Sequence, residues 1–408
     1  MSPTSLAYAA LTQQYIRTVS KLPAWDKSKV SAGSNESRGG FWRLLVVREG
    51  RDETFLPLPP ASPGDAGAGG GAGDVTMTSQ GDDAAGGGRL LRGCEMRALP
   101  LERWAVPVVA QGEAAPEVPE AEPAAPSPEH VLLMVQVNPA VTDEATMEAE
   151  LQALGSFLRE RAAAQGLSLT ALWVQLHSGV ANAAPAGAPT RVVAGFGGPE
   201  GSGGVITDSL CQLKFRISPQ AFFQVNAGAT CLLYHLAGSW AAATPSTLLL
   251  DVCCGTGTIG ISLAASAKAV VGIDNVESAV EDAKANAALN GVGNASWVCG
   301  AAEKVFGRLL RDHAAANDDI AAIVDPPRAG LHKFVLKALL GCPQITRLVY
   351  IACNPDSLAR DCAILCKPSR REGIGEPLTP FRPVKALAFD LFPHTPHVES
   401  VMLLEREL

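Results

Sequence analysis

From Leu210 onward, short apolar runs alternate regularly with stretches of helical periodicity. This alternation is typical of a doubly wound α/β fold, in which mainly parallel strands are buried between two layers of helices. In such sheets the ligand lies at the carboxyl ends of the strands, so the residues that follow each strand are the first candidates for a functional site. We predict strands at residues 247–252, 268–274, 295–299, 320–324, 347–352, 384–391 and 398–405.

The first half of the chain has a different organisation. Residues 59–129 hold 4 basic and 11 acidic residues and are rich in Gly, Ala and Pro. Such a segment buries too little apolar surface to offset the entropy of ordering, so we predict a disordered insertion there. It divides a small α+β domain into residues 1–58 and 130–210, and the doubly wound domain follows at 211–408. Within the small domain we expect helices at 6–19 and 143–165 and strands at 41–48, 130–137 and 169–176.

Charge and composition limit the class of protein. The formal net charge of −8 belongs to the first half, because residues 211–408 hold 18 basic and 18 acidic residues, so a nucleic-acid partner is compatible with the second half. No apolar run approaches the roughly 18 residues of a membrane-spanning helix, and we expect no membrane partner and no secretory signal. The ten cysteines lack metal-ligand spacing, so we expect reduced thiols, no metal site and no iron–sulfur cluster in an intracellular protein. The cytosol, the nucleus and an organelle remain open.

A glycine-rich turn follows the first strand of the doubly wound domain. Residues 251–260 read DVCCGTGTIG, and Gly255, Gly257 and Gly260 allow a tight turn whose backbone amides face a ligand. Asp274 ends the next strand, where a carboxylate can accept hydrogen bonds from ribose hydroxyls. This pair of features fits a nicotinamide cofactor and S-adenosylmethionine equally well.

The fourth and fifth strands favour the second cofactor. Asp325-Pro326-Pro327-Arg328 follows the fourth strand, and methyltransferases of nucleobases commonly carry an Asp-Pro-Pro motif at this place. An aromatic residue usually follows the prolines in enzymes that methylate exocyclic amines, so Arg328 argues against that reaction. Cys353 ends the fifth strand, just before Asn354 and Pro355, which form a good helix start. We therefore predict a lowered thiol pKa and a nucleophilic role for Cys353.

Five ordered motifs give the second half of the chain a family resemblance. It resembles the RNA 5-methyluridine methyltransferases, with the greatest likeness to the eukaryotic tRNA (uracil-5-)-methyltransferase that modifies the T-loop. The resemblance covers essentially all of 211–408 and implies a Rossmann-like methyltransferase sheet, S-adenosyl-L-methionine as cofactor and tRNA as substrate. The motifs are FRISPQAFFQVN (215–226), DVCCGTGTIG (251–260), DPPR (325–328), CNP (353–355) and FPHTPHVE (392–399).

The resemblance also implies roles for single residues. Carbon 5 of uracil is a poor nucleophile, so a thiolate, here Cys353, first adds to carbon 6. The methyl group of S-adenosylmethionine is then transferred to carbon 5, and a base, here Glu399, removes the carbon 5 proton so that the enzyme is released. Apolar neighbours of Glu399 are expected to raise its pKa. The cofactor is expected to contact Gln224, placed at the start of a helix, and Cys253, Gly255, Gly257, Thr258, Asp274 and Asp325.

Two other functions compete with this interpretation. One is a methyltransferase of the same fold that acts on rRNA uridine or a free nucleobase. The other is a tRNA-binding chaperone without essential catalysis, against which Cys353 and Glu399 argue because a binding protein needs neither a nucleophile nor a base. In either case we expect a monomer.

Overall fold

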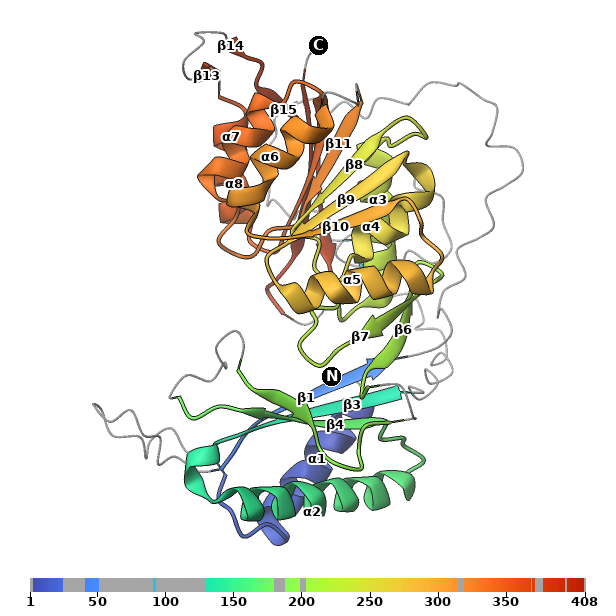
Figure 1. Ribbon diagram of the computed structural model, residues 1–408, viewed down its shortest axis with the longest axis vertical. Coiled ribbons are helices and arrows are strands. Elements are labelled where there is room, and N and C mark those ends of the chain that lie inside the picture. The colour runs from blue at the N-terminus through green and yellow to red at the C-terminus, as the bar shows by residue number, and fades with distance from the viewer. Residues whose placement is uncertain are drawn as a thin grey trace, which may run out of the picture.

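The computed structural model contains two main β-sheets, each covered by helices (Figure 1). A four-stranded sheet belongs to the first half of the chain, and an eight-stranded sheet is built chiefly by the second half. The structure describes residues 3–24, 41–50, 91–92, 130–179, 188–198, 203–314, 317, 319–367, 369–370, 377–392 and 395–406.

The smaller sheet has the strand order β1-β3-β4-β5. Its central strand β3 (His130–Val137) pairs antiparallel with β1 (Trp42–Gly50) and parallel with β4 (Ala171–Leu176). Two helices cover one face, and their apolar sides share a core with Leu133, Val135 and Leu172. The remaining elements are α1 (Pro3–Thr18), the 3-10 helix η4 (Pro139–Val141), α2 (Glu144–Ala163) and the edge strand β5 (Thr190–Val192).

A hairpin that the sequence pattern did not predict follows the small sheet. Strands β6 (Ile206–Leu210) and β7 (Leu213–Ile217) pair antiparallel. Cys211 and Gln212 join them with φ values of 53° and 63°, as a two-residue turn of type I′ requires at both of its central positions. Ile206 and Ile217 pack on the face of the small sheet that the helices leave free, so the hairpin connects the two halves of the chain.

The larger sheet has the strand order β10-β9-β8-β11-β12-β16-β15-β2. The five strands from β10 to β12 are parallel, and β16 runs antiparallel to both of its neighbours. The strand order reverses between β8 and β11, so the crevice for a ligand is expected at the carboxyl ends of these strands. The strands are β2 (Leu91–Arg92), β8 (Leu248–Val252), β9 (Ala269–Asp274), β10 (Ala295–Cys299), β11 (Ile320–Val324), β12 (Ile345–Ala352), β15 (Phe381–Asp390) and β16 (Glu399–Arg406).

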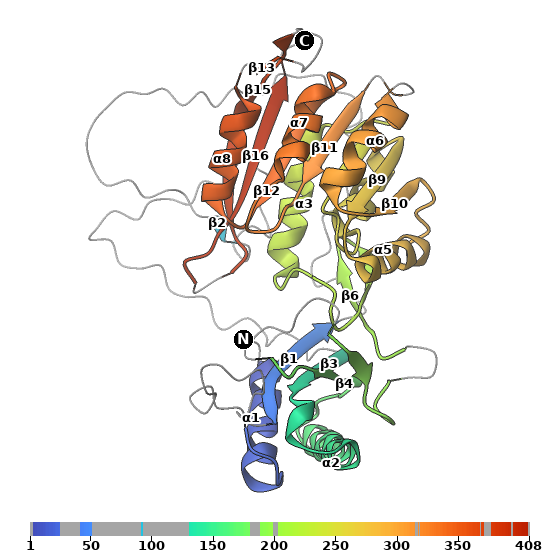
Figure 2. The same ribbon diagram turned by 60° about the vertical axis from the view of Figure 1, so that its left-hand side comes forward.

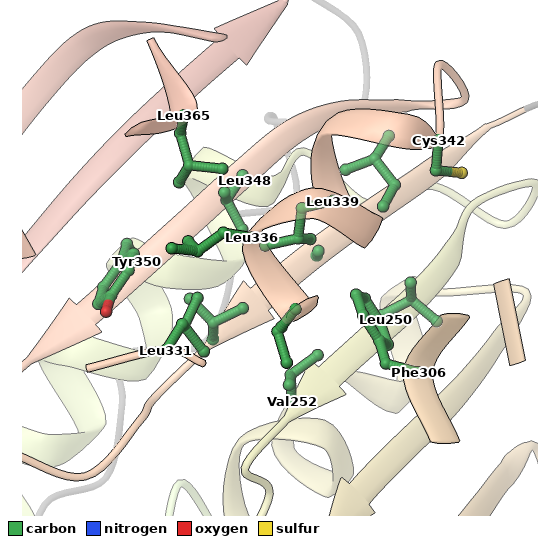
Figure 3. Packing of buried hydrophobic residues seen from close by; sticks show 14 of the residues in the cluster. Leu250, Val252, Phe306, Leu331, Leu336, Leu339, Cys342, Leu348, Tyr350 and Leu365 are labelled. Carbon is green, nitrogen blue, oxygen red and sulfur yellow. The ribbon is translucent and has the colours of Figure 1, made fainter. Parts of the chain in front are cut away.

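Helices cover both faces of the larger sheet, as the two views show (Figures 1 and 2). One face packs against α6, α7 and α8 around a cluster that includes Leu250, Phe306 and Leu348 (Figure 3), and the other packs against α3, α4 and α5. The elements are α3 (Ala227–Ala241), α4 (Thr258–Leu263), the 3-10 helix η5 (Ala264–Ser266), α5 (Glu277–Leu289), α6 (Ala302–Ala314), α7 (Lys333–Gly341) and α8 (Pro355–Leu365). Strands β13 (Ser369–Arg370) and β14 (Pro377–Leu378) form a separate pair.

The predicted doubly wound sheet is confirmed, because all seven expected strands lie within three residues of their predicted bounds. In the segment 59–129, Leu91–Arg92 pair with Phe389–Asp390 at the edge of the larger sheet. The rest of that segment lies outside the described residues, so its disorder and the domain boundaries remain predictions. No helix in the described part of the chain combines the length and apolar character needed to cross a membrane.

Candidate active site

The glycine-rich turn at the end of β8 has an unusual backbone. Cys253, Gly255 and Gly257 all have positive φ values, of 68°, 52° and 78°. A Cβ atom on Gly257 would lie 2.7 Å from the Trp297 ring, whereas one on Gly255 would meet no atom within 4 Å. Gly257 is therefore required by packing and by conformation, and Gly255 faces open space that a ligand can enter.

Two carboxylates hold this turn. Asp274 Oδ2 accepts a hydrogen bond from Gly255 N at 2.9 Å, and its Oδ1 accepts one from Val276 N at 2.9 Å. Asp251 is fully buried; its Oδ2 accepts from Gly260 N at 2.8 Å, while its Oδ1 has no partner. Each oxygen of Asp274 keeps a second lone pair, so a ribose hydroxyl can still donate to it.

Two further expected cofactor residues are Thr258, which follows the turn directly, and Gln224. Thr258 begins α4, and its hydroxyl lies 2.9 Å from the hydroxyl of the buried Tyr234. Gln224 is buried, but the prediction that it starts a helix is wrong: α3 begins at Ala227, with Asn226 as its cap through a bond to Ala229 N. The Asn226 side chain supplies the capping acceptor, so Gln224 lies in the irregular segment before the helix.

A second group of residues lies at the neighbouring strand ends. Asp325 follows β11, Cys353 follows β12, and Glu399 is the first residue of β16. Because β12 and β16 are antiparallel with Ala352 opposite Ser400, their register places Cys353 opposite Glu399. The sheet thus brings together the thiol and the carboxyl group that the sequence places 46 positions apart.

Burial controls the protonation of this second group. Glu399 is 3% exposed, and burial, with repulsion from Asp325, raises its pKa to about 8. Burial raises the pKa of the half-buried Asp325 to about 7. The predicted increase for Glu399 is therefore confirmed.

The prediction of a lowered thiol pKa for Cys353 is wrong. Burial and the negative charges of Glu399 and Asp325 raise the pKa of this thiol, and together they outweigh the opposing charge and hydrogen bond of Arg328. The carboxylates come from other strands, so the helix start after Cys353 gave no indication of them. Without substrate, the thiol is predominantly protonated at neutral pH.

Asp325, a member of the second group, also acts on the glycine turn. Its charge contributes to the raised pKa values of Cys353 and Glu399 on one side and of Asp251 and Cys253 on the other. The glycine turn and the thiol–carboxyl pair therefore lie on either side of β11, at the same end of the sheet. This arrangement follows from the reversal of strand order between β8 and β11.

Sequence reasoning did not single out Asp251 as a site residue. Burial and repulsion from Asp325 and Asp274 raise its pKa to about 7. The sequence feature that could have identified Asp251 is its place at the start of the glycine-turn motif, one residue before the end of β8. Among the described residues, no group of three or more His, Cys, Asp and Glu side chains is placed to hold a metal ion, and the nine cysteines described are free thiols.

A comparison with protein families identifies the larger domain. Residues 207–407 match the family model described as tRNA (Uracil-5-)-methyltransferase. These residues belong to the tRNA (uracil-5-)-methyltransferase family. The methyltransferase domain so defined contains every predicted site residue, and the family uses S-adenosylmethionine.

Individual relatives agree with this assignment. The whole chain is 36% identical over 509 aligned positions to zinc finger CCCH domain-containing protein 24 of Arabidopsis thaliana, of which it spans 54%. The methyltransferase domain is 46% identical over 203 residues to human tRNA (uracil-5-)-methyltransferase homolog A, covering 49% of this chain and 31% of that protein. The chain therefore spans about half or less of these relatives.

One solved structure is similar to this chain as well. It is the Pyrococcus abyssi tRNA (uracil-54, C5)-methyltransferase in complex with S-adenosyl-L-homocysteine. The likeness has a TM-score of 0.47 and 25% identity, and it covers 67% of this chain and 56% of that one.

Proposed function

We propose that this protein methylates carbon 5 of a uridine in the T-loop of tRNA, with S-adenosylmethionine as methyl donor and Cys353 as a covalent nucleophile. The observation that supports this most directly is the placement of Cys353 opposite Glu399, with Asp325 acting on both, in a domain of this family. A reaction that passes through a covalent adduct needs a nucleophile that reaches carbon 6 of the uracil ring and a base that reaches the proton on the adjacent carbon 5.

Cys353 is proposed to attack carbon 6 of the uracil ring: the sulfur–carbon bond forms as the π bond between carbons 5 and 6 opens, and the electron pair is held as an enolate whose carbon 5 then takes the methyl group. Its thiol must first lose its proton, since only the thiolate is an effective nucleophile. The carboxyl groups of Asp325 and Glu399 and the guanidinium of Arg328 are the charged groups that act on this sulfur. Arrival of the RNA base excludes water from the half-buried thiol, so these groups decide when the thiolate forms.

Glu399 is proposed to remove the proton from carbon 5 after methylation. A pKa of about 8 gives this carboxyl group a much higher proton affinity than an exposed glutamate. A base with a pKa near the working pH combines availability with driving force for proton transfer. The same carboxyl group can therefore hold the abstracted proton at its oxygen until the site reopens to water.

The cofactor residues fit S-adenosylmethionine, which supplies an electrophilic methyl group when bound. The space before Gly255 is open, Asp274 keeps acceptor capacity for the ribose, and the buried Asp251 Oδ1 is without a partner at the base of the turn. Asp274 would hold the ribose and Gly255 would allow close approach of the backbone.

The experiment compares three variants of the full chain, incubated with transcribed tRNA and methyl-labelled cofactor. Cys353→Ala is expected to lose both methyl transfer and any covalent complex. Glu399→Gln is expected to add to the ring and methylate it but not to release it, which leaves a labelled, slowly migrating band on a denaturing gel. Cys366→Ala, which changes a half-buried thiol at the end of α8, is the matched control and should turn over normally.

Each result has a clear meaning. Methyl transfer by Cys353→Ala at a comparable rate would refute the covalent mechanism, and normal turnover by Glu399→Gln would refute the base. Nucleoside mass spectrometry of tRNA and rRNA identifies the substrate. Label in rRNA alone would replace the tRNA assignment, and binding of tRNA without any label would favour a chaperone.

A further inference from the structure

The loop between β11 and α7 is fastened to the rest of the domain by a buried carboxylate on α8. Asp361 is 1% exposed, and its Oδ2 accepts hydrogen bonds from Leu331 N and from the Tyr350 hydroxyl, both at 2.7 Å. Its Oδ1 accepts from Arg360 Nε at 3.1 Å and Nη2 at 2.9 Å. Leu331 and Tyr350 also belong to the apolar cluster of Figure 3, so the carboxylate lies at the edge of a dry core.

Two more side chains from the same helix region hold the loop. Arg360 Nη2 donates to the carbonyl of Ala329 at 2.6 Å, and Asn354 Nδ2 donates to the carbonyl of Arg328 at 3.0 Å. Gly330, with φ of 79°, lies directly under these groups. A Cβ atom there would be 2.4 Å from Arg360 Nη2 and 2.6 Å from the carboxylate described above.

The backbone of residues 328–331 is therefore fixed at three points, and Asp361 is common to two of them. It bonds Leu331 N directly, and it orients Arg360, whose guanidinium reaches the Ala329 carbonyl. A buried carboxylate with four charge-assisted or hydroxyl bonds is a strong and geometrically specific anchor.

This loop carries Arg328, the cation that acts on the nucleophile. The charged groups that face the Cys353 sulfur are Glu399 from β16 and Asp325 and Arg328 from the loop after β11. Two of the three are carboxyl groups, whose ionised forms repel a thiolate. The position of the guanidinium thus decides whether a thiolate can exist among them.

We infer that Asp361 is a positioning residue for the nucleophile: by anchoring residues 328–331 to α8, it keeps the Arg328 guanidinium beside the Cys353 sulfur. That Cys353 serves as a nucleophile rests on the proposed function, whereas the anchoring of residues 328–331 by Asp361 does not. Nothing in the chemistry requires Asp361 to touch substrate or cofactor.

The test measures the alkylation rate of Cys353 by iodoacetamide at pH 8 in the full chain without RNA, by peptide mass spectrometry. Arg328→Gln should slow alkylation about tenfold, which corresponds to one unit of thiol pKa for the loss of one neighbouring charge. Asp361→Asn should slow it in the same direction by several-fold, because an amide cannot accept from both Leu331 N and Arg360. The exposed thiol of Cys299 in the same sample is the internal control.

The double variant separates positioning from general structural damage. If Asp361 acts through Arg328, Arg328→Gln with Asp361→Asn is no slower than Arg328→Gln alone. Additive losses, or an unchanged rate in Asp361→Asn, would overturn the inference. Asp319→Asn is the matched control: its carboxylate accepts a hydrogen bond from the Thr247 hydroxyl at the amino ends of β11 and β8, whereas Cys353 lies at the carboxyl end of β12, so Cys353 should react as in the parent.

Two further measurements complete the test. If Asp361→Asn does not fold, Arg360→Ala is used in its place. The Arg360 side chain is 55% exposed, so its removal is tolerated by the fold, yet it is the donor to the Ala329 carbonyl in the parent protein. Slower alkylation of Cys353 in this variant supports the inference, and an unchanged rate refutes it. The affinity for S-adenosylhomocysteine should be unchanged in each folded variant. A parent protein that alkylates as expected but does not methylate RNA would refute the proposed function and leave this inference intact.

Discussion

Replacing Glu399 with Gln should stabilise the protein, and the gain should grow with pH. Burial and Asp325 raise the pKa of this carboxyl from 4.5 to about 8. Since the folded-state pKa is the higher one, the stabilising effect of the neutral form is complete below about pH 4.5 and is lost as the pH rises through about 8. At 1.36 kcal/mol per pKa unit, the difference between pH 5 and pH 9 is on the order of 4 kcal/mol.

The assay is thermal unfolding of parent and variant at both pH values. For a domain of this size, about 4 kcal/mol corresponds to roughly 10 °C in Tm, so the variant should gain about that much over the parent at pH 9 relative to pH 5. Glu405→Gln on the same strand is the control; its carboxylate pairs with Arg347 at 3.3 Å and Arg382 at 3.8 Å, and its replacement should not stabilise at pH 9. An equal Tm difference at both pH values for Glu399→Gln would refute the reasoning.

Three further predictions concern the turn and the insertion. Asp274→Ala should weaken S-adenosylhomocysteine binding in calorimetric titration without loss of secondary structure, and an unchanged affinity would move the cofactor site elsewhere. Gly257→Ala should lower the free energy of unfolding by several kcal/mol, of which about 1–2 kcal/mol come from the positive φ and about 1–3 kcal/mol from the clash with Trp297. Gly291→Ala is the control: its φ is 66° but no atom lies within 4 Å, so denaturant unfolding should show only the loss from the positive φ. Deleting residues 62–126 removes only β2 from the described structure; Tm and activity should change little, and a large loss would show that the segment is ordered.

The sequence was sufficient for the larger sheet because each strand is an apolar run bounded by polar or turn residues. The rule that ligands bind at the carboxyl ends of parallel strands also selected the glycine turn, Asp274, Asp325 and Cys353 as candidate site residues. It could not locate Glu399, since β16 is antiparallel and presents its first residue, not the one after it. That residue came from the family resemblance alone.

Non-local contacts explain what the sequence did not reveal. The thiol pKa depends on carboxyl groups from two other strands, which no local pattern around Cys353 indicates. The β6–β7 hairpin was missed because its turn uses Cys211 and Gln212 where Asn and Gly are the usual residues. Asp361 looked like an ordinary helix residue until the fold placed the Leu331 amide against it.

The place of β16 within the sheet has a consequence for biosynthesis. This strand lies between β12 and β15, although both precede it in the chain. The two neighbours of β16 are therefore synthesised before the strand that joins them, and the Cys353 thiol has no Glu399 carboxyl beside it until β16 has been made. The proposed nucleophile and the proposed base therefore come together only when β16 inserts, and a chain that stops before β16 would carry Cys353 without Glu399.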